Sequence, residues 1–249
     1  SIESFNQFST DFGFSPKNYN FPTSLLEIPL TLSKEQDVYI DFFENNQNVI
    51  PYFSSILFQN HFVDVVNFLK LAKPKTIVAD NLGLIEIAEN LNINVIFGYH
   101  LNIFNSASAQ YFSQFKNCKG IILSSELSKE DFENFDIPAH TDIWLPDSSY
   151  VQLMQSRQCL LRNIPDSKTG LPCSKPETDF SCIENCSRTE IIYGSQKEKI
   201  IAKKRKGFYS ALFPLPQELV KPNYQSLIER FSEPQKKDLP IIRQIFYIN

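Results

Sequence analysis

Short apolar runs alternate with helical patterns along the first 150 residues of this chain. The runs recur roughly every 20 to 25 residues, which is the spacing of strands joined by short helices. Strands are expected at 25–32, 48–53, 75–80, 94–98, 120–123 and 141–145, and helices at 62–71, 84–91, 107–115 and 129–135. Because parallel strands need a crossover connection that is usually helical, this alternation predicts βα units around a parallel sheet.

Units of this kind build either an open doubly wound sheet or a barrel, so the predicted fold class is α/β. The expected strands are fewer than the eight of a full TIM barrel, so a barrel built from them would be incomplete. In such a barrel the functional residues lie at the carboxyl ends of the strands.

Hydrophobic period, cysteine content and charge change along the chain, and these changes predict four parts. Residues 1–24 form an irregular arm without a stable hydrophobic period, and residues 25–155 form the partial β/α barrel. Residues 156–196 hold four of the five cysteines in a polar segment of little periodicity. Residues 197–249 contain a basic run and a proline-containing tail, which we expect to pack on the barrel.

Composition excludes several classes of protein. The chain has 42% hydrophobic and 21% charged residues, which is ordinary for a folded protein with a core. Its apolar runs are strand-sized, so no membrane span is expected. Only 7 glycines occur, and neither GxGxxG nor GxxxxGK[ST] is present, which removes the main support for Rossmann and P-loop folds. The net charge of -4 argues against bulk coating of nucleic acid but permits a local basic patch.

The strongest chemical signal is a set of four cysteines with the spacing C-x13-C-x8-C-x3-C, formed by Cys159, Cys173, Cys182 and Cys186. Four thiolates on a polar segment can surround one soft metal ion or one cluster. The absence of a CxxC pair lowers zinc relative to an iron–sulfur cluster, and zinc, a four-iron cluster and no metal all stay open. The first residues show no secretory pattern, so a reducing, cytoplasmic compartment is expected and disulfides are disfavoured.

Several motifs together resemble one known family. They are Leu101-Asn102-Ile103-Phe104-Asn105-Ser106, Leu123-Ser124-Ser125-Glu126-Leu127, Ser156-Arg157-Gln158-Cys159, the three later cysteines of the set, and Lys206-Gly207-Phe208-Tyr209. In these segments, which span about residues 75–215, the chain resembles the collagenase-like peptidase family U-thirty-two. The resemblance implies a TIM-type barrel followed by a cysteine segment that binds a 4Fe-4S cluster through Cys159, Cys173, Cys182 and Cys186.

The resemblance also implies a range of activities. Similar members hydroxylate pyrimidines in transfer or ribosomal RNA without molecular oxygen, paired members hydroxylate a quinone precursor, and others carry only a peptidase label. The family's N-terminal PELLAPAG-like strand motif is absent, so the chain resembles the C-terminal part of a longer member. A missing N-terminal part or a partner chain would then complete the barrel. The family's His-Gly pair is replaced here by Pro146-Asp147.

Polar side chains follow two of the expected strands and are the candidate site. We assign His100 and Glu126 as catalytic, and Asn102, Asn105 and Arg157 as substrate-binding, because these groups can exchange protons or hydrogen-bond a planar substrate. Asn105 reads equally well as a helix N-cap, and Arg157 as a surface salt bridge. Two other histidines, His61 and His140, lack a partner motif and are expected to be structural.

The function predicted from these features is an iron–sulfur-dependent enzyme that resembles the oxygen-independent RNA hydroxylases. RNA would contact Lys203, Lys204, Arg205 and Lys206, although a basic run is most simply a solvated surface. A collagenase-like peptidase is the first alternative, weakened by the absence of HExxH and of a Ser-His-Asp order. A zinc-stapled, non-enzymatic binding module is the second alternative.

Overall fold

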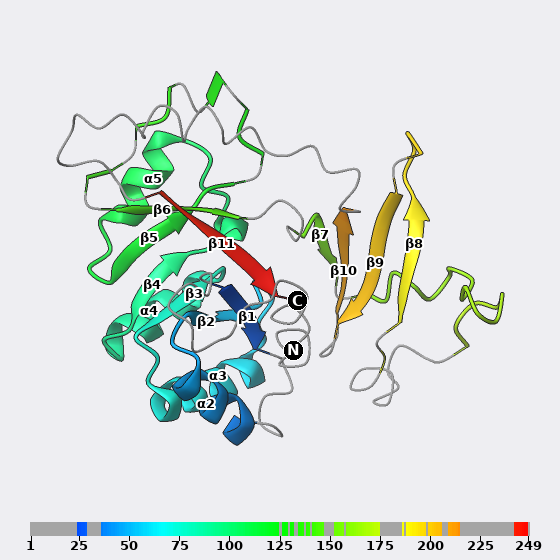
Figure 1. Ribbon diagram of the computed structural model, residues 1–249, viewed down its shortest axis with the longest axis horizontal. Coiled ribbons are helices and arrows are strands. Elements are labelled where there is room, and N and C mark those ends of the chain that lie inside the picture. The colour runs from blue at the N-terminus through cyan, green and yellow to red at the C-terminus, as the bar shows by residue number, and fades with distance from the viewer. Residues whose placement is uncertain are drawn as a thin grey trace. The chain divides into compact units, whose positions relative to one another are not determined.

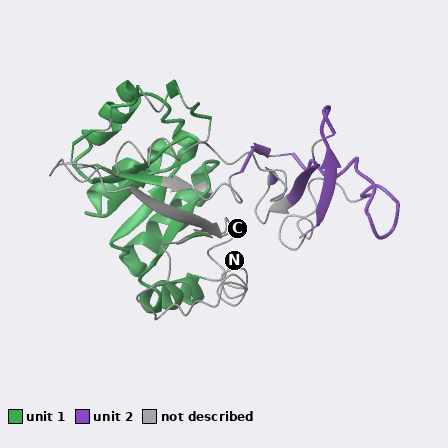
Figure 2. Ribbon diagram, turned by 45° about the horizontal axis from the view of Figure 1, so that its top comes forward, with its two compact units in different colours: residues 1–28, 32–147, 221–249 green, residues 29–31, 148–220 purple. Residues whose placement is uncertain are grey.

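The computed structural model divides the chain into two compact units (Figure 2). The first unit comprises residues 1–28, 32–147 and 221–249, and the second comprises residues 29–31 and 148–220. The structure describes residues 24–28, 36–124, 126–128, 130–131, 134–136, 138–139, 141–146, 152–156, 158–174, 186, 188–197, 199–205, 209–214 and 242–248. This division differs from the predicted one, since residues 199–214 join the cysteine segment rather than the tail.

Seven described strands of the first unit form a closed parallel barrel (Figure 1). They are β1 (Ser24–Ile28), β2 (Val49–Phe53), β3 (Thr76–Ala79), β4 (Asn94–Phe97), β5 (Cys118–Ile122), β6 (Asp142–Pro146) and β11 (Ile242–Ile248). Their order around the barrel is β1-β11-β6-β5-β4-β3-β2. The predicted α/β class with a curled parallel sheet is therefore confirmed, and all six strands expected from the alternation are present.

Strand β11 shows how the C-terminal tail meets the barrel. The tail supplies a strand that lies between β1 and β6 and pairs with both in parallel. Open strand edges expose unpaired N–H and C=O groups, and β11 covers both edges at once. Closure therefore uses strands of this chain, where the sequence suggested a missing N-terminal part or a partner chain.

Four described α-helices connect these strands: α2 (Gln36–Asn45), α3 (Gln59–Ala72), α4 (Leu82–Asn90) and α5 (Ser106–Ser113). A short 3-10 helix, η2 (Tyr99–Leu101), follows β4. Helix α2 was not expected, because half of its residues are polar and only Tyr39 and Phe43 are buried. No helix in the described parts of the chain is long and apolar enough to cross a membrane.

Alternate residues of the barrel strands face two different cores. One set packs with the helices in a single apolar cluster, which includes Ile28, Phe53, Ile77, Phe97 and Ile121 from the strands and Phe68 and Leu84 from the helices. The intervening residues Leu25, Tyr52, Val78, Ile96, Ile122 and Trp144 are also buried but lie outside that cluster. Their alternation with the helix-facing set is typical of side chains that fill the interior of a barrel.

The second unit contains a four-stranded antiparallel sheet in the order β7-β10-β9-β8. Its strands are β7 (Met154–Ser156), β8 (Thr189–Tyr193), β9 (Lys199–Arg205) and β10 (Tyr209–Pro214). The basic run predicted at 197–206 is thus largely strand β9, whose apolar centre Ile200-Ile201-Ala202 pairs with both β8 and β10. The many basic residues of this segment are typical of a solvated surface, so its sequence did not predict a strand.

His61 on α3 has a structural role, as expected. Its side chain is 3% exposed, and its Nδ1 accepts a hydrogen bond of 3.2 Å from the backbone N–H of Phe58. Burial lowers the pKa of His61, and the nearby Asp64 only partly opposes this effect. The ring is therefore neutral in the folded chain, which is the state that an accepting Nδ1 requires. His140 lies outside the described residues.

The lowered pKa of His61 predicts a pH-dependent stability. Below a pH of about 6.5 the unfolded chain takes up a proton at His61 that the folded chain does not, so the free energy of unfolding falls as the pH decreases. The variant His61→Asn keeps an acceptor near the Nδ1 position but does not titrate, so its stability should change less between pH 7 and pH 5. Urea unfolding of both proteins at each pH measures this difference. Parallel pH curves for the two proteins would contradict it.

Candidate functional site

The carboxyl ends of β3 and β4 bring Asp80 and His100 together. Asp80 follows β3 directly, and His100 lies in η2, just after β4. Asp80 Oδ2 lies 2.6 Å from His100 Nδ1, and Asp80 Oδ1 accepts a hydrogen bond of 3.1 Å from the backbone N–H of His100. The Asp80 side chain is fully buried, whereas 20% of the His100 side chain is exposed. One carboxylate thus fixes both the backbone and the ring of His100.

Two tyrosines complete the surroundings of the His100 ring. The Tyr52 hydroxyl, from β2, lies 3.5 Å from His100 Nδ1, and the Tyr99 ring centroid lies 4.0 Å from the imidazole centroid. Because Asp80 engages Nδ1, Nε2 is the ring nitrogen through which His100 can exchange a proton with a substrate. A carboxylate in this position orients the imidazole, as in other Asp–His pairs.

Gly98 makes this arrangement sterically possible. It follows β4 directly, and its backbone N–H donates a hydrogen bond of 2.9 Å to the carbonyl of Ala79. A Cβ atom on Gly98 would overlap Asp80 Oδ1. The absence of a side chain at residue 98 therefore lets the Asp80 carboxylate lie beside β4 and reach His100.

The other predicted site residues that follow barrel strands, Asn102, Asn105 and Glu126, are exposed. Glu126 follows β5, and its backbone N–H donates to the hydroxyl of the buried Ser124 at 3.3 Å. Asn102 ends η2 in the left-handed conformation, with φ of 54°. In the part of the chain that the structure describes, no hydrogen bond joins Glu126, Asn102 or Asn105 to His100. Arg157 lies outside the described residues.

Asn105 caps helix α5. Its side-chain oxygen accepts a hydrogen bond of 2.8 Å from the backbone N–H of Ser108, and the Ser108 hydroxyl accepts a longer one of 3.4 Å from the N–H of Asn105. This reciprocal pair is a capping box, so the helix-cap interpretation of Asn105 is confirmed. Ser128 and Asp131 form a similar reciprocal pair, in which each side chain accepts the backbone N–H of the other residue.

Three of the four predicted metal ligands lie in the described part of the second unit. Cys159, Cys173 and Cys186 are free, half-buried thiols, which is suitable donor chemistry for a soft metal or a cluster. Cys182 lies outside the described residues. Within the described ranges, no three His, Cys, Asp or Glu side chains gather closely enough to hold a metal ion. Burial raises the pKa of Cys118, on β5, to about 11, and its side chain packs against the apolar cluster of the first unit.

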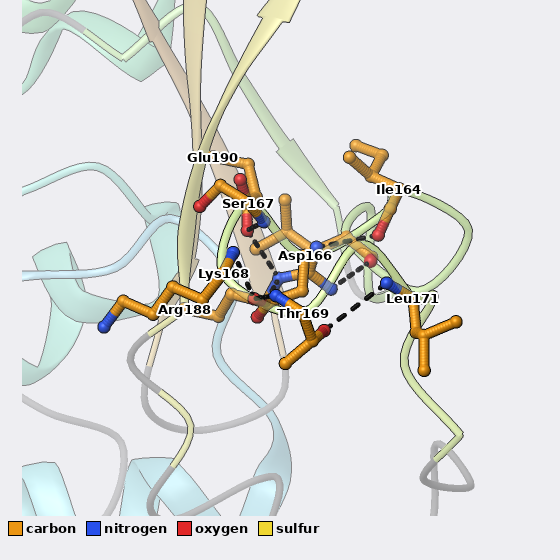
Figure 3. A network of polar contacts seen from close by, with 9 residues as sticks. Ile164, Asp166, Ser167, Lys168, Thr169, Leu171, Arg188 and Glu190 are labelled. Carbon is orange, nitrogen blue, oxygen red and sulfur yellow. Dashed lines mark hydrogen bonds and ion pairs between the residues drawn. The ribbon is translucent and has the colours of Figure 1, made fainter.

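Arg188 organises the loop between Cys159 and Cys173 (Figure 3). Its Nη1 and Nη2 donate to the carbonyls of Leu161 and Ile164 at 3.0 Å and 2.7 Å. Its Nε donates to Glu190 Oε1 at 2.9 Å. The loop is thus attached to β8 by the side chain of one arginine, 14% of which is exposed.

Asp166 and Glu190 complete this polar network. The Asp166 carboxylate accepts the backbone N–H groups of Lys168 and Thr169, and it lies 3.4 Å from Arg188 Nε. Glu190 also accepts the N–H of Ser167 at 3.1 Å. These hydrogen bonds lower the pKa of both carboxyl groups.

Sequence reasoning identified His100 but missed Asp80, Tyr52 and Arg188. Asp80 carried a usable signal, since it ends the strand-like run 75–80 and so lies at the functional edge of a barrel. Arg188 follows the last cysteine by two residues but has no local motif. Tyr52 looks like any aromatic residue of a buried strand, so its position beside His100 depends on the fold.

Comparison with known proteins adds no assignment to this geometry. No protein-family model matches the chain, and no curated protein or solved structure matches it either. The interpretation of the site therefore depends on the contacts described above and on the chemistry of the residues that make them.

The close approach of Gly98 to Asp80 predicts the effect of one methyl group. Gly98→Ala should lower the free energy of unfolding by about 2 kcal/mol, because the Asp80 carboxylate must leave its place in a packed interior. In an Asp80→Ala background the same substitution should lower the free energy of unfolding much less, since the new Cβ atom no longer meets a carboxylate. Urea unfolding of the four proteins completes the cycle. An equal loss in both backgrounds would show that Asp80 is not the group displaced.

Proposed function

We propose that this chain is an enzyme with a TIM-type barrel that resembles the RNA-hydroxylating branch of peptidase family U-thirty-two. The observation that carries the proposal is the Asp80–His100 pair at the carboxyl end of the barrel strands, where such barrels carry out their chemistry. A planar pyrimidine of transfer or ribosomal RNA is the proposed substrate.

His100 would act as the general base or acid at its Nε2 atom. Replacing a pyrimidine C–H bond by a C–OH bond with water as the oxygen source releases two protons and two electrons. A partly exposed imidazole can accept one proton, and the electrons would pass by way of the cluster to an external electron acceptor. Asp80 would hold Nδ1–H and keep the ring in one orientation. Glu126, exposed after β5, would be the second group able to exchange protons.

The cysteine set would hold the redox group. Cys159, Cys173, Cys182 and Cys186 would bind a 4Fe-4S cluster, with zinc as the alternative, and such a cluster supplies electron transfer when it is bound. The free thiols of the three described cysteines fit this donor chemistry. Since no group of three ligands is gathered among the described residues, binding would have to draw the cysteine segment together.

Strand β9 would provide the contact with RNA. It contains Lys203, Lys204 and Arg205, while Lys206 lies outside the described residues. Tyr193, on the neighbouring strand β8, is 67% exposed and pairs with Lys199 across the sheet. Tyr193 lies opposite Lys199, at the other end of β9 from Lys203, so the exposed ring would stack on a base while the far end of the strand neutralises phosphates.

Metal content tests the cluster directly. After anaerobic purification the chain should contain about four irons and four sulfides, with a visible charge-transfer absorption. Replacing Cys159, Cys173, Cys182 and Cys186 by serine should remove the iron, whereas Cys118→Ser should retain it. About one zinc per chain, or no metal at all, would refute the iron–sulfur enzyme.

The Asp80–His100 pair is tested by RNA hydroxylation. His100→Gln should lower kcat roughly a hundredfold or more, because it removes the group that transfers the proton. Asp80→Asn should lower kcat with a smaller change in KM, since it disturbs the orientation of the ring. Mass spectrometry of nucleosides from treated transfer and ribosomal RNA measures the product, and His61→Asn is the control for loss of a structural histidine. Full activity of His100→Gln, or cleavage of gelatin in place of RNA hydroxylation, would overturn the proposal.

A further inference from the structure

The guanidinium of Arg188 lies where several stretches of the second unit meet (Figure 3). Two of its nitrogens donate to the carbonyls of Leu161 and Ile164, and the third donates to Glu190 on β8. All three contacts are 3.0 Å or shorter, and the Glu190 side chain is only 7% exposed. The loop thus depends on this arginine for hydrogen bonds that the sheet does not provide.

The position of Arg188 in the sequence gives this contact a further meaning. Arg188 follows Cys186 by two residues, and Leu161 follows Cys159 by two residues. One side chain therefore connects the chain just after the first cysteine of the set to the chain just after the last. The N–H of Leu160 also donates to the hydroxyl of the fully buried Ser210 on β10, which attaches the residue next to Cys159 to the sheet.

We propose that Arg188 is a positioning residue that holds the segments carrying Cys159 and Cys186 in place before any metal or cluster binds. Binding then draws in Cys173, which no hydrogen bond of this network reaches among the described residues. This inference rests on the thiolate site of the proposed function. It agrees with the finding that, among the described residues, no three potential ligands are yet gathered.

The planar shape of the guanidinium is essential to this role. The N–H groups of the Arg188 guanidinium point in fixed directions within one plane, so they donate to two carbonyls and one carboxylate at once. A lysine at residue 188 would keep the charge but could not reproduce the three directions. Glutamine would lose both the charge and most of the contacts, so the two substitutions separate the charge from the geometry.

Binding of Co²⁺ to the metal-free chain tests the proposal. The intensity of the thiolate-to-Co²⁺ charge-transfer band reports how many thiols bind, and its dependence on the Co²⁺ concentration gives the affinity. We expect Arg188→Gln to weaken Co²⁺ binding roughly tenfold or more, as loss of a residue that orients metal ligands does, and Arg188→Lys to recover only part of this loss. Lys168→Gln is the matched control, because it removes a positive charge from the same loop but keeps the backbone N–H that Asp166 accepts.

Amide hydrogen exchange of the metal-free proteins provides the second measurement. In Arg188→Gln the amides of Lys168, Thr169 and Gly170 should exchange faster than in the wild type, while those of β9 and β10 stay protected. If Arg188→Gln does not fold, Arg188→Lys gives the same comparison with a smaller effect.

The outcomes separate this inference from the proposed function. Equal Co²⁺ affinity of wild type, Arg188→Gln and Arg188→Lys would overturn the positioning role and leave the thiolate site intact. A wild-type chain that shows no thiolate band and contains no iron would instead refute the cluster itself. Unchanged loop exchange in both Arg188 variants would also overturn the positioning role.

Discussion

Closure of the parallel sheet into a barrel is the constraint on which the candidate site depends. Each strand is joined to the next by a crossover connection, which lets all strands run in the same direction. Their carboxyl ends therefore lie together at one end of the barrel. Closure requires β11, which lies almost a hundred residues beyond β6 in the sequence and satisfies the backbone groups of two edges. The second unit is inserted between β6 and β11. The chain therefore places its cysteine unit without interrupting the βα order that positions Asp80 and His100.

The buried carboxylate of Asp80 links stability to chemistry. A fully buried charge is costly unless it is hydrogen-bonded, and His100 supplies both a ring nitrogen and a backbone N–H. The same contacts orient the imidazole, so the burial of the Asp80 carboxylate and the orientation of the His100 ring depend on each other. Gly98 contributes by having no side chain, since any Cβ there would occupy the position of the carboxylate. The backbone after β4 and the orientation of the His100 ring are thus set by one close approach between the ends of neighbouring strands.

The sequence predicted the βα units because strands with β-branched residues and amphipathic helices leave clear periods. It did not predict α2, which buries only two residues, or β11, whose partners are distant in the sequence. The site was predictable in part, because residues that directly follow a clearly periodic strand lie at the carboxyl end of the barrel. His100 follows a recognisable strand, whereas Tyr52 becomes part of the site only when β2 and β4 are brought to the same rim. Asn105 shows the opposite case, in which a polar residue after a strand serves as a helix cap.

The cysteine segment illustrates how a polar loop is held without an apolar core of its own. Little of its sequence is hydrophobic, so burial alone cannot offset the entropy of ordering it. Arg188 supplies directional hydrogen bonds instead, and Asp166 and Glu190 accept several of the loop's backbone N–H groups. Such bonds fix only the backbone groups that they reach. Among the described residues these bonds reach from Leu161 to Leu171, so they fix the backbone between Cys159 and Cys173 and leave both thiols free for ligation.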